Sequence, residues 1–180
     1  RITEEEIVAL ANYAESSPPT TDESRIPFPQ ADDFERVIDI TDFVATEPRS
    51  AEDIALNYEF HLRQADYYFS AARYLGLGEL VRGSDGISYR CLTEAGKQVA
   101  SLPYAEKRKA YAARILKIPS VREIFLQSVR AGEIMELDFA ESIVRQHSAD
   151  HGIGGATIRR RTQTVVAWVK WLFSLDPSRR

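Results

Sequence analysis

The segment from Gly78 to Leu92 constrains the fold of this chain more than any other part of the sequence. Two short runs of alternating or β-branched residues flank Ser84-Asp85-Gly86. An Asp-Gly pair between such runs is a strong local signal for a β-hairpin. The segments before and after it have helical patterns, so we expect the hairpin to stand among helices.

Three helices are predicted before the hairpin and one after it. The first follows Asp33, and Ser50 with Asp53 forms a capping box that starts the second. The third is expected over residues 61–75. Thr93 follows the hairpin as the cap of a last helix. Three helices, of which the third is the longest, followed by a hairpin are the element order of a winged helix-turn-helix.

A second set of helices is predicted after the first. A linking helix is expected over residues 104–118, and Pro119 starts the next helix. A short helix around Asp138 and a long one over residues 157–175 complete the set. Five residues follow the long helix, so this unit is expected to be poor in wing structure. The predicted fold is therefore mainly α, with tandem winged helix-turn-helix units and one β-hairpin wing, in the first unit.

The predicted organisation has three parts. Residues 1–31 hold a short helix and a Pro-rich arm, and residues 16–29 are expected to lack regular structure because they contain four prolines. Residues 32–102 hold the first winged-helix unit. Residues 103–180 hold the linking helix and the second, winged-helix-like unit.

The two long helices align as copies of one unit when they are offset by 97 residues. Their matching positions are i, i+3, i+4, i+7 and i+10, which trace one helical face. In the first copy these are Ala65, Tyr68, Phe69, Ala72 and Leu75, and in the second Thr162, Val165, Val166, Val169 and Leu172. We expect this face to be buried in both copies. The alternative is a chance similarity between amphipathic helices.

Charge is unevenly distributed along the chain, whose net charge is −4. Residues 1–31 carry a net charge of −4, residues 32–100 a net charge of −6, and residues 101–180 a net charge of +6. A polyanion would therefore meet mainly the last 80 residues. The alternative is a solvated surface with scattered charge.

Candidate DNA contacts lie at the start of the second long helix. In helix-turn-helix proteins the N-terminal residues of this helix reach base edges in the major groove, where arginine pairs with guanine and glutamine with adenine. The candidates are Thr157, Arg159, Arg160, Arg161, Gln163 and Thr164, and the last four are expected to be exposed. Thr157 follows a glycine-rich loop, and its hydroxyl and the backbone N–H groups suit a phosphate. At least one of Arg160, Arg161 and Gln163 is expected to contact a base, and the alternative is a solvated or salt-bridged surface.

The first long helix offers a matching set of candidates, which are expected to be exposed. These are Arg63, Gln64 and Tyr67, with Arg82 and Arg90 on the hairpin. Glu59, Asp66 and Asp85 would face the same polyanion, so the residues support contact and its absence equally.

The composition gives no support for an enzyme site. The one cysteine, Cys91, excludes a disulfide framework and a multi-cysteine zinc site. His147 and His151 with Asp150 could hold a metal only if their loop were helical, and Gly152 argues against that. The sequence contains no Walker loop, no nucleophile elbow and no nuclease-type acid pair followed by Glu-x-Lys. We therefore expect a non-catalytic chain without a cofactor.

Targeting signals are not apparent in the sequence. No stretch approaches 18 uncharged apolar residues, and the first residues lack the pattern of a signal peptide. We expect no membrane contact, and a cytoplasmic location is the default. A chain that begins with Arg1 is expected to be a processed product or a fragment of a longer protein.

Three segments carry a family resemblance. They are Arg63-Gln-Ala-Asp-Tyr-Tyr-Phe-Ser-Ala-Ala-Arg-Tyr-Leu-Gly-Leu, Leu92-Thr-Glu-Ala-Gly, and Thr157-Ile-Arg-Arg-Arg-x-x-Thr-x-x-x-Trp. They resemble winged-helix modules that accompany restriction–modification proteins, over roughly residues 30–175. The resemblance implies paired winged-helix units that recognise a DNA sequence or organise a complex, while a separate domain cuts.

Two functional hypotheses follow. The first is a double-stranded DNA-binding module, a non-catalytic part of a restriction–modification-type nuclease, whose companion is a nuclease domain or a partner subunit. The second is a winged-helix protein-interaction or dimerisation module. The basic C-terminal unit favours the first hypothesis, and the acidity of residues 1–100 favours the second. DNA binding should weaken steeply with salt, whereas apolar docking should not.

Overall fold

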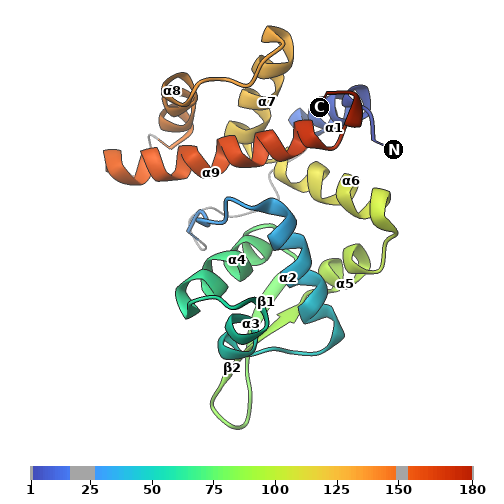
Figure 1. Ribbon diagram of the computed structural model, residues 1–180, viewed down its shortest axis with the longest axis vertical. Helices are drawn as coiled ribbons and strands as arrows, with labels where there is room; N and C mark the ends of the chain where they lie inside the picture. Colours follow the sequence, from blue (N-terminus) through green and yellow to red (C-terminus); the bar gives the residue numbers. More distant parts are fainter. Residues whose placement is uncertain (1, 17–26, 149–153, 180) are drawn as a thin grey trace. The chain divides into compact units, whose positions relative to one another are not determined.

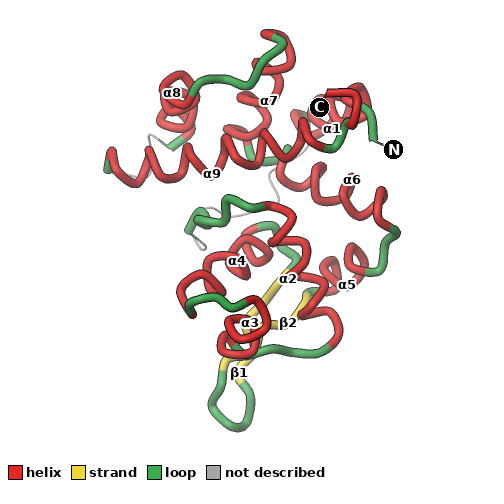
Figure 2. The backbone as a smooth tube through the Cα atoms, in the orientation of Figure 1, coloured by secondary structure: helices red, strands yellow, loops and turns green. Residues whose placement is uncertain are grey.

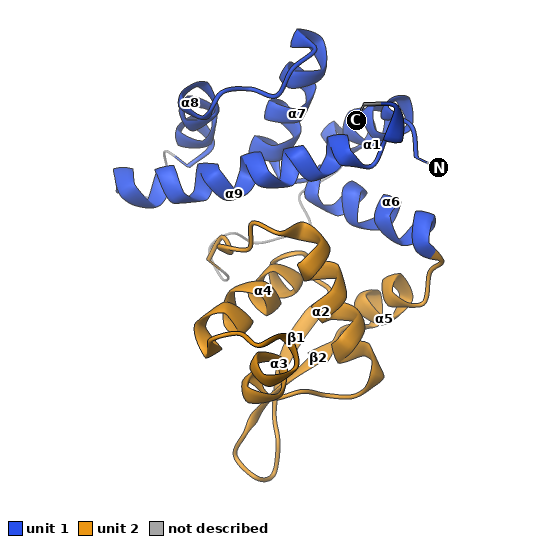
Figure 3. Ribbon diagram, viewed as in Figure 1, with its two compact units in different colours: residues 1–20, 104–180 blue, residues 21–103 orange. Residues whose placement is uncertain are grey.

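A computed structural model describes residues 2–16, 27–148 and 154–179. Over these residues the chain is mainly helical, with one two-stranded antiparallel sheet (Figure 1; Figure 2). The chain divides into two compact units (Figure 3). We call residues 21–103 the hairpin unit, and residues 1–20 with 104–180 the helical unit. Across the described ranges, none of the helices is long and apolar enough to cross a membrane.

The hairpin unit has the predicted order of elements. These are α2 (Phe34–Thr46), α3 (Ala51–Tyr58), α4 (Leu62–Tyr74), β1 (Gly78–Arg82), β2 (Ser88–Leu92) and α5 (Glu94–Ala100). The expected capping box is confirmed, because the Asp53 N–H donates to Ser50 Oγ at 3.0 Å and the Ser50 N–H donates to Asp53 Oδ2 at 3.0 Å. The Thr93 hydroxyl likewise caps α5 by accepting from the Gly96 N–H at 3.1 Å. Local polar side chains therefore set the helix starts that the sequence predicted.

The hairpin is closed by the expected Asp-Gly turn. Gly86 adopts φ 82°, a left-handed conformation that suits glycine. The Gly83 N–H donates to the Ile87 carbonyl at 2.8 Å. The register pairs Gly78 with Leu92, so the two strands are matched from one end to the other.

A third backbone segment joins the hairpin. Arg49, which lies between α2 and α3, forms an isolated antiparallel bridge with Arg90 of β2. The Arg49 N–H donates to the Arg90 carbonyl at 3.0 Å, and the Arg90 N–H donates to the Arg49 carbonyl at 2.6 Å. Strand β2 therefore lies between β1 and the α2–α3 link. This pairing was not predicted from the sequence.

The core of the hairpin unit forms where the predicted face of α4 meets α2 and α3. Ala65, Phe69, Ala72 and Leu75 are each at most 1% exposed, as predicted, whereas Tyr68, the fifth residue of the predicted face, is half-buried. Gly96 lies so close to the Leu77 backbone that a Cβ could not fit between them. The glycine therefore lets α5 approach the turn that leads into the hairpin.

The helical unit is built from both ends of the chain. Its elements are α1 (Glu4–Glu15), α6 (Tyr104–Ile115), α7 (Pro119–Ala131), α8 (Leu137–His147), α9 (Gly155–Ser174) and the 3₁₀ turn η2 (Pro177–Arg179). The Glu4 N–H donates to Asp176 Oδ2 at 2.9 Å, and Lys109 pairs with Glu6 at 3.0 Å. Helix α1 packs against α6 and α7. The placement of α1 in this unit was not predicted from the sequence.

Helix boundaries in the helical unit differ slightly from the predicted ones. Helix α6 ends at Ile115 rather than Ile118, and α9 begins at Gly155 rather than Thr157. Of the arm expected to be irregular, residues 17–26 lie outside the described residues, and residues 27–29 belong to no helix or strand.

Helix α9 is the central helix of its unit and packs against both α7 and α8. The five predicted core positions of α9 are all buried, and Trp168 and Trp171 are 0% and 6% exposed. Thr164 was predicted to be exposed, but it is fully buried. The prediction is wrong because α9 is buried around more of its circumference than α4, as the three consecutive buried residues Thr164, Val165 and Val166 show.

Candidate nucleic-acid interface

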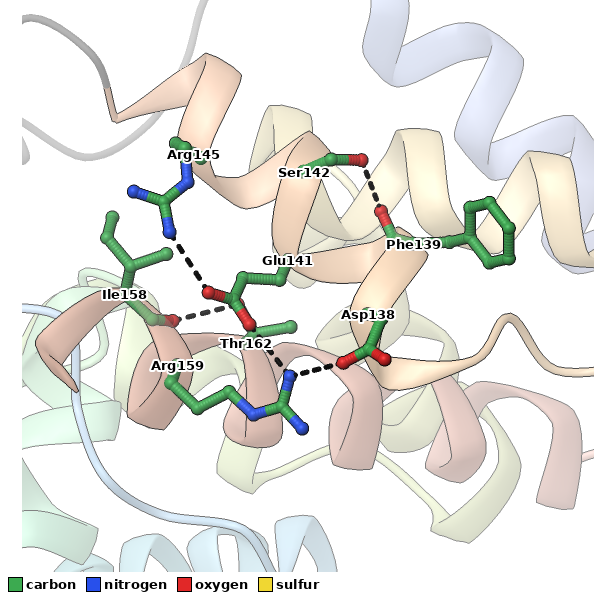
Figure 4. A network of polar contacts seen from close by, with 8 residues as sticks. All are labelled: Asp138, Phe139, Glu141, Ser142, Arg145, Ile158, Arg159 and Thr162. Carbon is green, nitrogen blue, oxygen red and sulfur yellow. Dashed lines mark hydrogen bonds and ion pairs between the residues drawn. The ribbon is translucent and has the colours of Figure 1, made fainter. Parts of the chain in front are cut away.

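Arg159, at the start of α9, is held by two carboxylates of α8 (Figure 4). Its Nη1 lies 2.7 Å from Asp138 Oδ1 and 2.8 Å from Glu141 Oε2. Arg145 donates to the other oxygen of Glu141 at 3.0 Å. The hydrogen bond from Arg159 lowers the pKa of Glu141, and the bonds to Glu141 and Asp138 raise the pKa of Arg159. Both charges of this ion pair therefore persist at neutral pH.

Arg160 and Arg161 also make contacts within their own unit. Arg160 Nη1 lies 3.1 Å from Thr164 Oγ1, and Arg161 Nη1 donates to Ser148 Oγ at 3.1 Å. Both arginines are half-buried, so their predicted exposure is wrong. Consecutive helical residues project about 100° apart, and α9 is covered on more than one side. Three arginines in a row therefore cannot form one exposed face.

The remaining α9 candidates lie in different surroundings. Thr157 is exposed in the first turn of α9, whose N-cap is Gly154. Most of the preceding glycine-rich loop, residues 149–153, lies outside the described residues. Gln163 is exposed, whereas Thr164 is buried and cannot meet a ligand.

Arg63 and Gln64 are exposed at the start of α4, as predicted. Arg63 Nε donates to the Tyr67 hydroxyl at 2.6 Å, and its guanidinium carbon lies 5.3 Å from the centre of the Tyr67 ring. Tyr67 was predicted to be exposed but is half-buried. Residues four apart on a helix lie one above the other, so the Arg63 side chain covers part of Tyr67. Tyr67 therefore supports the Arg63 side chain.

The hairpin adds two arginines with different roles. Arg82 is exposed at the end of β1. The Arg90 side chain is 13% exposed, and its Nη2 pairs with Asp66 Oδ1 of α4 at 2.8 Å. A cleft of about 300 Å³ lies between α4 and the hairpin. Its lining residues are Asp66, Phe69, Ser70, Arg73, Leu80 and Arg90.

Two of the acidic residues that were expected to oppose a polyanion are engaged locally. Asp66 pairs with Arg90, as described above. Asp85 accepts from the Tyr89 hydroxyl at 2.6 Å and from the Ile87 N–H at 2.9 Å. These bonds, that of Tyr89 first, lower the pKa of Asp85. Both carboxylates thus stabilise the surface formed by residues 62–92, which we call the α4–hairpin face.

Charge is segregated within the hairpin unit. Residues 62–92, from the start of α4 to the end of β2, carry four arginines and three acidic side chains. The rest of residues 21–103 carries four basic and twelve acidic side chains. The net charge summed over residues 32–100 conceals this difference.

Comparison with protein families identifies one match. A family model, described as Domain of unknown function (DUF7226), matches residues 36–177. The match covers well over half of the chain. The chain belongs to this family. No curated protein and no solved structure matches the sequence.

The DUF7226 match includes most of both units. It spans α2 to α9 and the start of η2, and leaves α1 outside. Both helix triplets, α2–α4 and α7–α9, therefore lie within the family domain apart from the first two residues of α2.

The possible metal site formed by His147, Asp150 and His151 lies only partly within the described residues. His147 ends α8, and its Nε2 lies 2.6 Å from Glu123 Oε2. His151 and Asp150 lie outside the described residues. Within residues 2–16, 27–148 and 154–179, no group of three His, Cys, Asp or Glu side chains is placed to hold a metal ion.

The basic run of α6 is not a uniform surface. Arg108 is only 9% exposed, and its guanidinium carbon lies 3.5 Å from the centre of the Tyr104 ring. Lys109 is paired with Glu6. The basic run at residues 107–109 is therefore not a fully solvated surface.

Proposed function

We propose that the hairpin unit is a winged helix that binds double-stranded DNA through α4 and the hairpin. Its elements follow the order helix, bridging residue, helix, helix, hairpin. In this proposal α3 and α4 are the helix-turn-helix, and the hairpin with Arg49 is the wing sheet. The chain as a whole is then a DNA-binding module rather than a catalytic one.

The segregation of charge carries this proposal. DNA affinity depends largely on cationic side chains that neutralise phosphates. In an acidic unit, half of the basic side chains lie within residues 62–92, together with only three of the fifteen acidic ones. The α4–hairpin face can therefore approach a polyanion although the unit as a whole is acidic.

The individual side chains suit different contacts. Arg63 and Gln64 lie in the first turn of α4, the part of a recognition helix that meets base edges. The bond to Tyr67 restrains the Arg63 side chain, which lowers the side-chain entropy lost on binding. Arg82 on the hairpin suits a phosphate contact, which orients the protein without reading sequence.

The helical unit has a secondary role in this proposal. Thr157 and Gln163 remain exposed on α9, and Arg159, Arg160 and Arg161 would have to exchange their internal contacts for DNA. We therefore assign the primary DNA contact to α4. The resemblance to restriction–modification modules further supports a role beside a separate nuclease domain or subunit.

The test is duplex binding measured by fluorescence anisotropy at several salt concentrations. Arg82→Ala is expected to weaken binding to all sequences and to reduce the salt slope by about one. Lys97→Ala removes one charge from α5 of the same unit and is the matched control, expected to leave the slope unchanged. Absence of duplex binding at low salt, or equal effects of both substitutions, would overturn the proposal.

A protein-interaction module is the second candidate, and one observation favours it. Leu80, Val81 and Ile87 on the hairpin are 42%, 45% and 44% exposed. Exposed apolar side chains that cluster on one element indicate a docking surface. Sedimentation analysis of Val81→Asp and Ile87→Asp tests this alternative, because loss of self-association or of partner binding without a change in DNA affinity would favour it.

A further inference from the structure

A groove of about 580 Å³ lies in the helical unit, between α7, α8 and the segment that joins them. Its apolar part is formed by Ile134, Met135, Phe139 and Ile143. Ile134 and Met135 are half-buried, and Phe139 is 67% exposed. Figure 4 shows the Phe139 ring pointing away from the ion pairs of Arg159. A large aromatic ring therefore stands at the groove rather than in the core of the unit.

The groove has a fixed backbone. Gly132 ends α7 with φ 75°, so the chain turns sharply away from the helix. The Met135 N–H then donates to the buried Ser128 Oγ at 3.0 Å. This bond joins the connecting segment to α7. The groove is therefore formed in the unbound chain.

The charge of the groove is opposite to that of the sequence around it. Glu123, Glu133 and Glu136 line it, and the described lining residues include no Lys, Arg or His. Residues 101–180 as a whole carry 14 basic and 8 acidic side chains. A polyanion would be repelled from this place, so the groove is separate in chemistry from the proposed DNA contact.

We infer that this groove binds a basic amphipathic helix of a partner protein. A groove between two helices with an exposed aromatic side chain suits the apolar face of a third helix. Lysine or arginine on the flanks of that helix would meet Glu133 and Glu136, which are both exposed. The acidic rim supplies orientation and selects against acidic helices.

The probes are fluorescein-labelled helical peptides of about 14 residues, which span about 21 Å. One set carries Lys on the polar face and Leu, Met or Phe at the central apolar position. The control set carries Glu in place of each Lys. The Lys peptides are expected to bind the full chain in anisotropy titrations, and the Glu peptides are expected not to bind. Excess DNA duplex is expected to leave peptide binding unchanged.

Two variants locate the binding. Phe139→Ala is expected to weaken binding of the Lys peptide about tenfold or more. The double substitution Glu133→Lys with Glu136→Lys is expected to weaken this binding more at low salt than at high salt. Leu56→Ala removes a side chain that is 83% exposed on α3 and is the control, expected to have no effect. All these residues are at the surface, so circular dichroism should show unchanged folding.

Three results of the peptide titrations would overturn the inference. These are no binding of any Lys peptide, equal binding of Lys and Glu peptides, and equal affinity of Phe139→Ala and the parent. A dimer that Phe139→Ala dissociates in sedimentation equilibrium would also overturn it, because the occupant would then be a second copy of the chain.

Discussion

The helix triplets α2–α4 and α7–α9 place similar sequences in different surroundings. In both, the third helix packs against the first two. Under the offset of 97 residues, Arg63 corresponds to Arg160 and Tyr67 to Thr164. The two pairs make the same contact, Arg63 Nε to the Tyr67 hydroxyl at 2.6 Å and Arg160 Nη1 to Thr164 Oγ1 at 3.1 Å.

The difference arises from the neighbouring positions. Arg159 corresponds to Leu62, so α4 has no counterpart of the ion pairs that join Arg159 to α8. Arg63 is exposed, whereas Arg160 is half-buried. Equivalent positions in a sequence repeat thus differ in solvent exposure. A run of basic residues in a sequence shows that charge is present, but not whether the charged side chains can reach a ligand.

The largest expected effect tests whether the two triplets have equivalent cores, each within its own unit. Leu75→Ala and Leu172→Ala change corresponding residues that are both 0% exposed. Each should lower the free energy of unfolding by about 2–5 kcal/mol, because a buried Leu leaves a cavity. Urea unfolding measures this, and Leu56→Ala, at an exposed site, should change little. A large loss for only one of the pair would show that the repeat is not structural.

The next effect concerns DNA. Arg63→Ala should reduce affinity for a selected duplex by about 1–3 kcal/mol and relax preference at one base pair. Arg160→Ala should have a smaller effect, because that side chain is half-buried beside Thr164. Anisotropy titrations with selected and scrambled duplexes compare the two variants. A larger loss of affinity for Arg160→Ala than for Arg63→Ala would instead assign the primary DNA contact to α9.

A third effect concerns helix starts. Helix α3 begins with the reciprocal Ser50–Asp53 bonds, whereas Glu136 at the N-cap of α8 makes no side-chain cap bond. Ser50→Ala should therefore destabilise the hairpin unit by about 1 kcal/mol. Glu136→Ser should stabilise the helical unit by a fraction of that amount. Thermal unfolding followed by circular dichroism gives both values, and loss of stability in Glu136→Ser would contradict the explanation.

The smallest effect is that of pH on the Arg159 ion pairs. The pKa of Glu141 is lowered in the folded chain, chiefly by its hydrogen bond with Arg159. Its contribution to stability is therefore present above the unfolded pKa, about 4.3, and is lost as pH falls through the folded value. Arg159→Gln should lower the melting temperature slightly at pH 7, and by less at pH 3. A constant difference across this range would exclude the ion pair as its cause.

Local features were predictable from the sequence. The hairpin, the Ser50–Asp53 box and the Thr93 cap depend on residues within a few positions of one another, so their signals lie within short windows. The buried face of α4 followed from its spacing alone. These features account for the order of elements in the hairpin unit.

Contacts between distant residues could not be predicted in the same way. The pairing of Arg49 with Arg90 and the bond from Glu4 to Asp176 join residues far apart in sequence. The burial of Thr164 depends on the number of sides on which α9 is covered. Of the candidate site, the sequence located Arg63 and Gln64, but only the structure showed which carboxylates hold Arg159 and Arg90.

The pairing of Arg49 with Arg90 limits how strongly side-chain substitutions at these two positions can affect the hairpin. It is made by N–H and carbonyl groups alone, so any residue other than proline at either position can maintain it. The direction in which the hairpin projects is thus insensitive to the identity of these side chains. Substitutions that change the chemistry of the hairpin surface can therefore leave this backbone pairing intact.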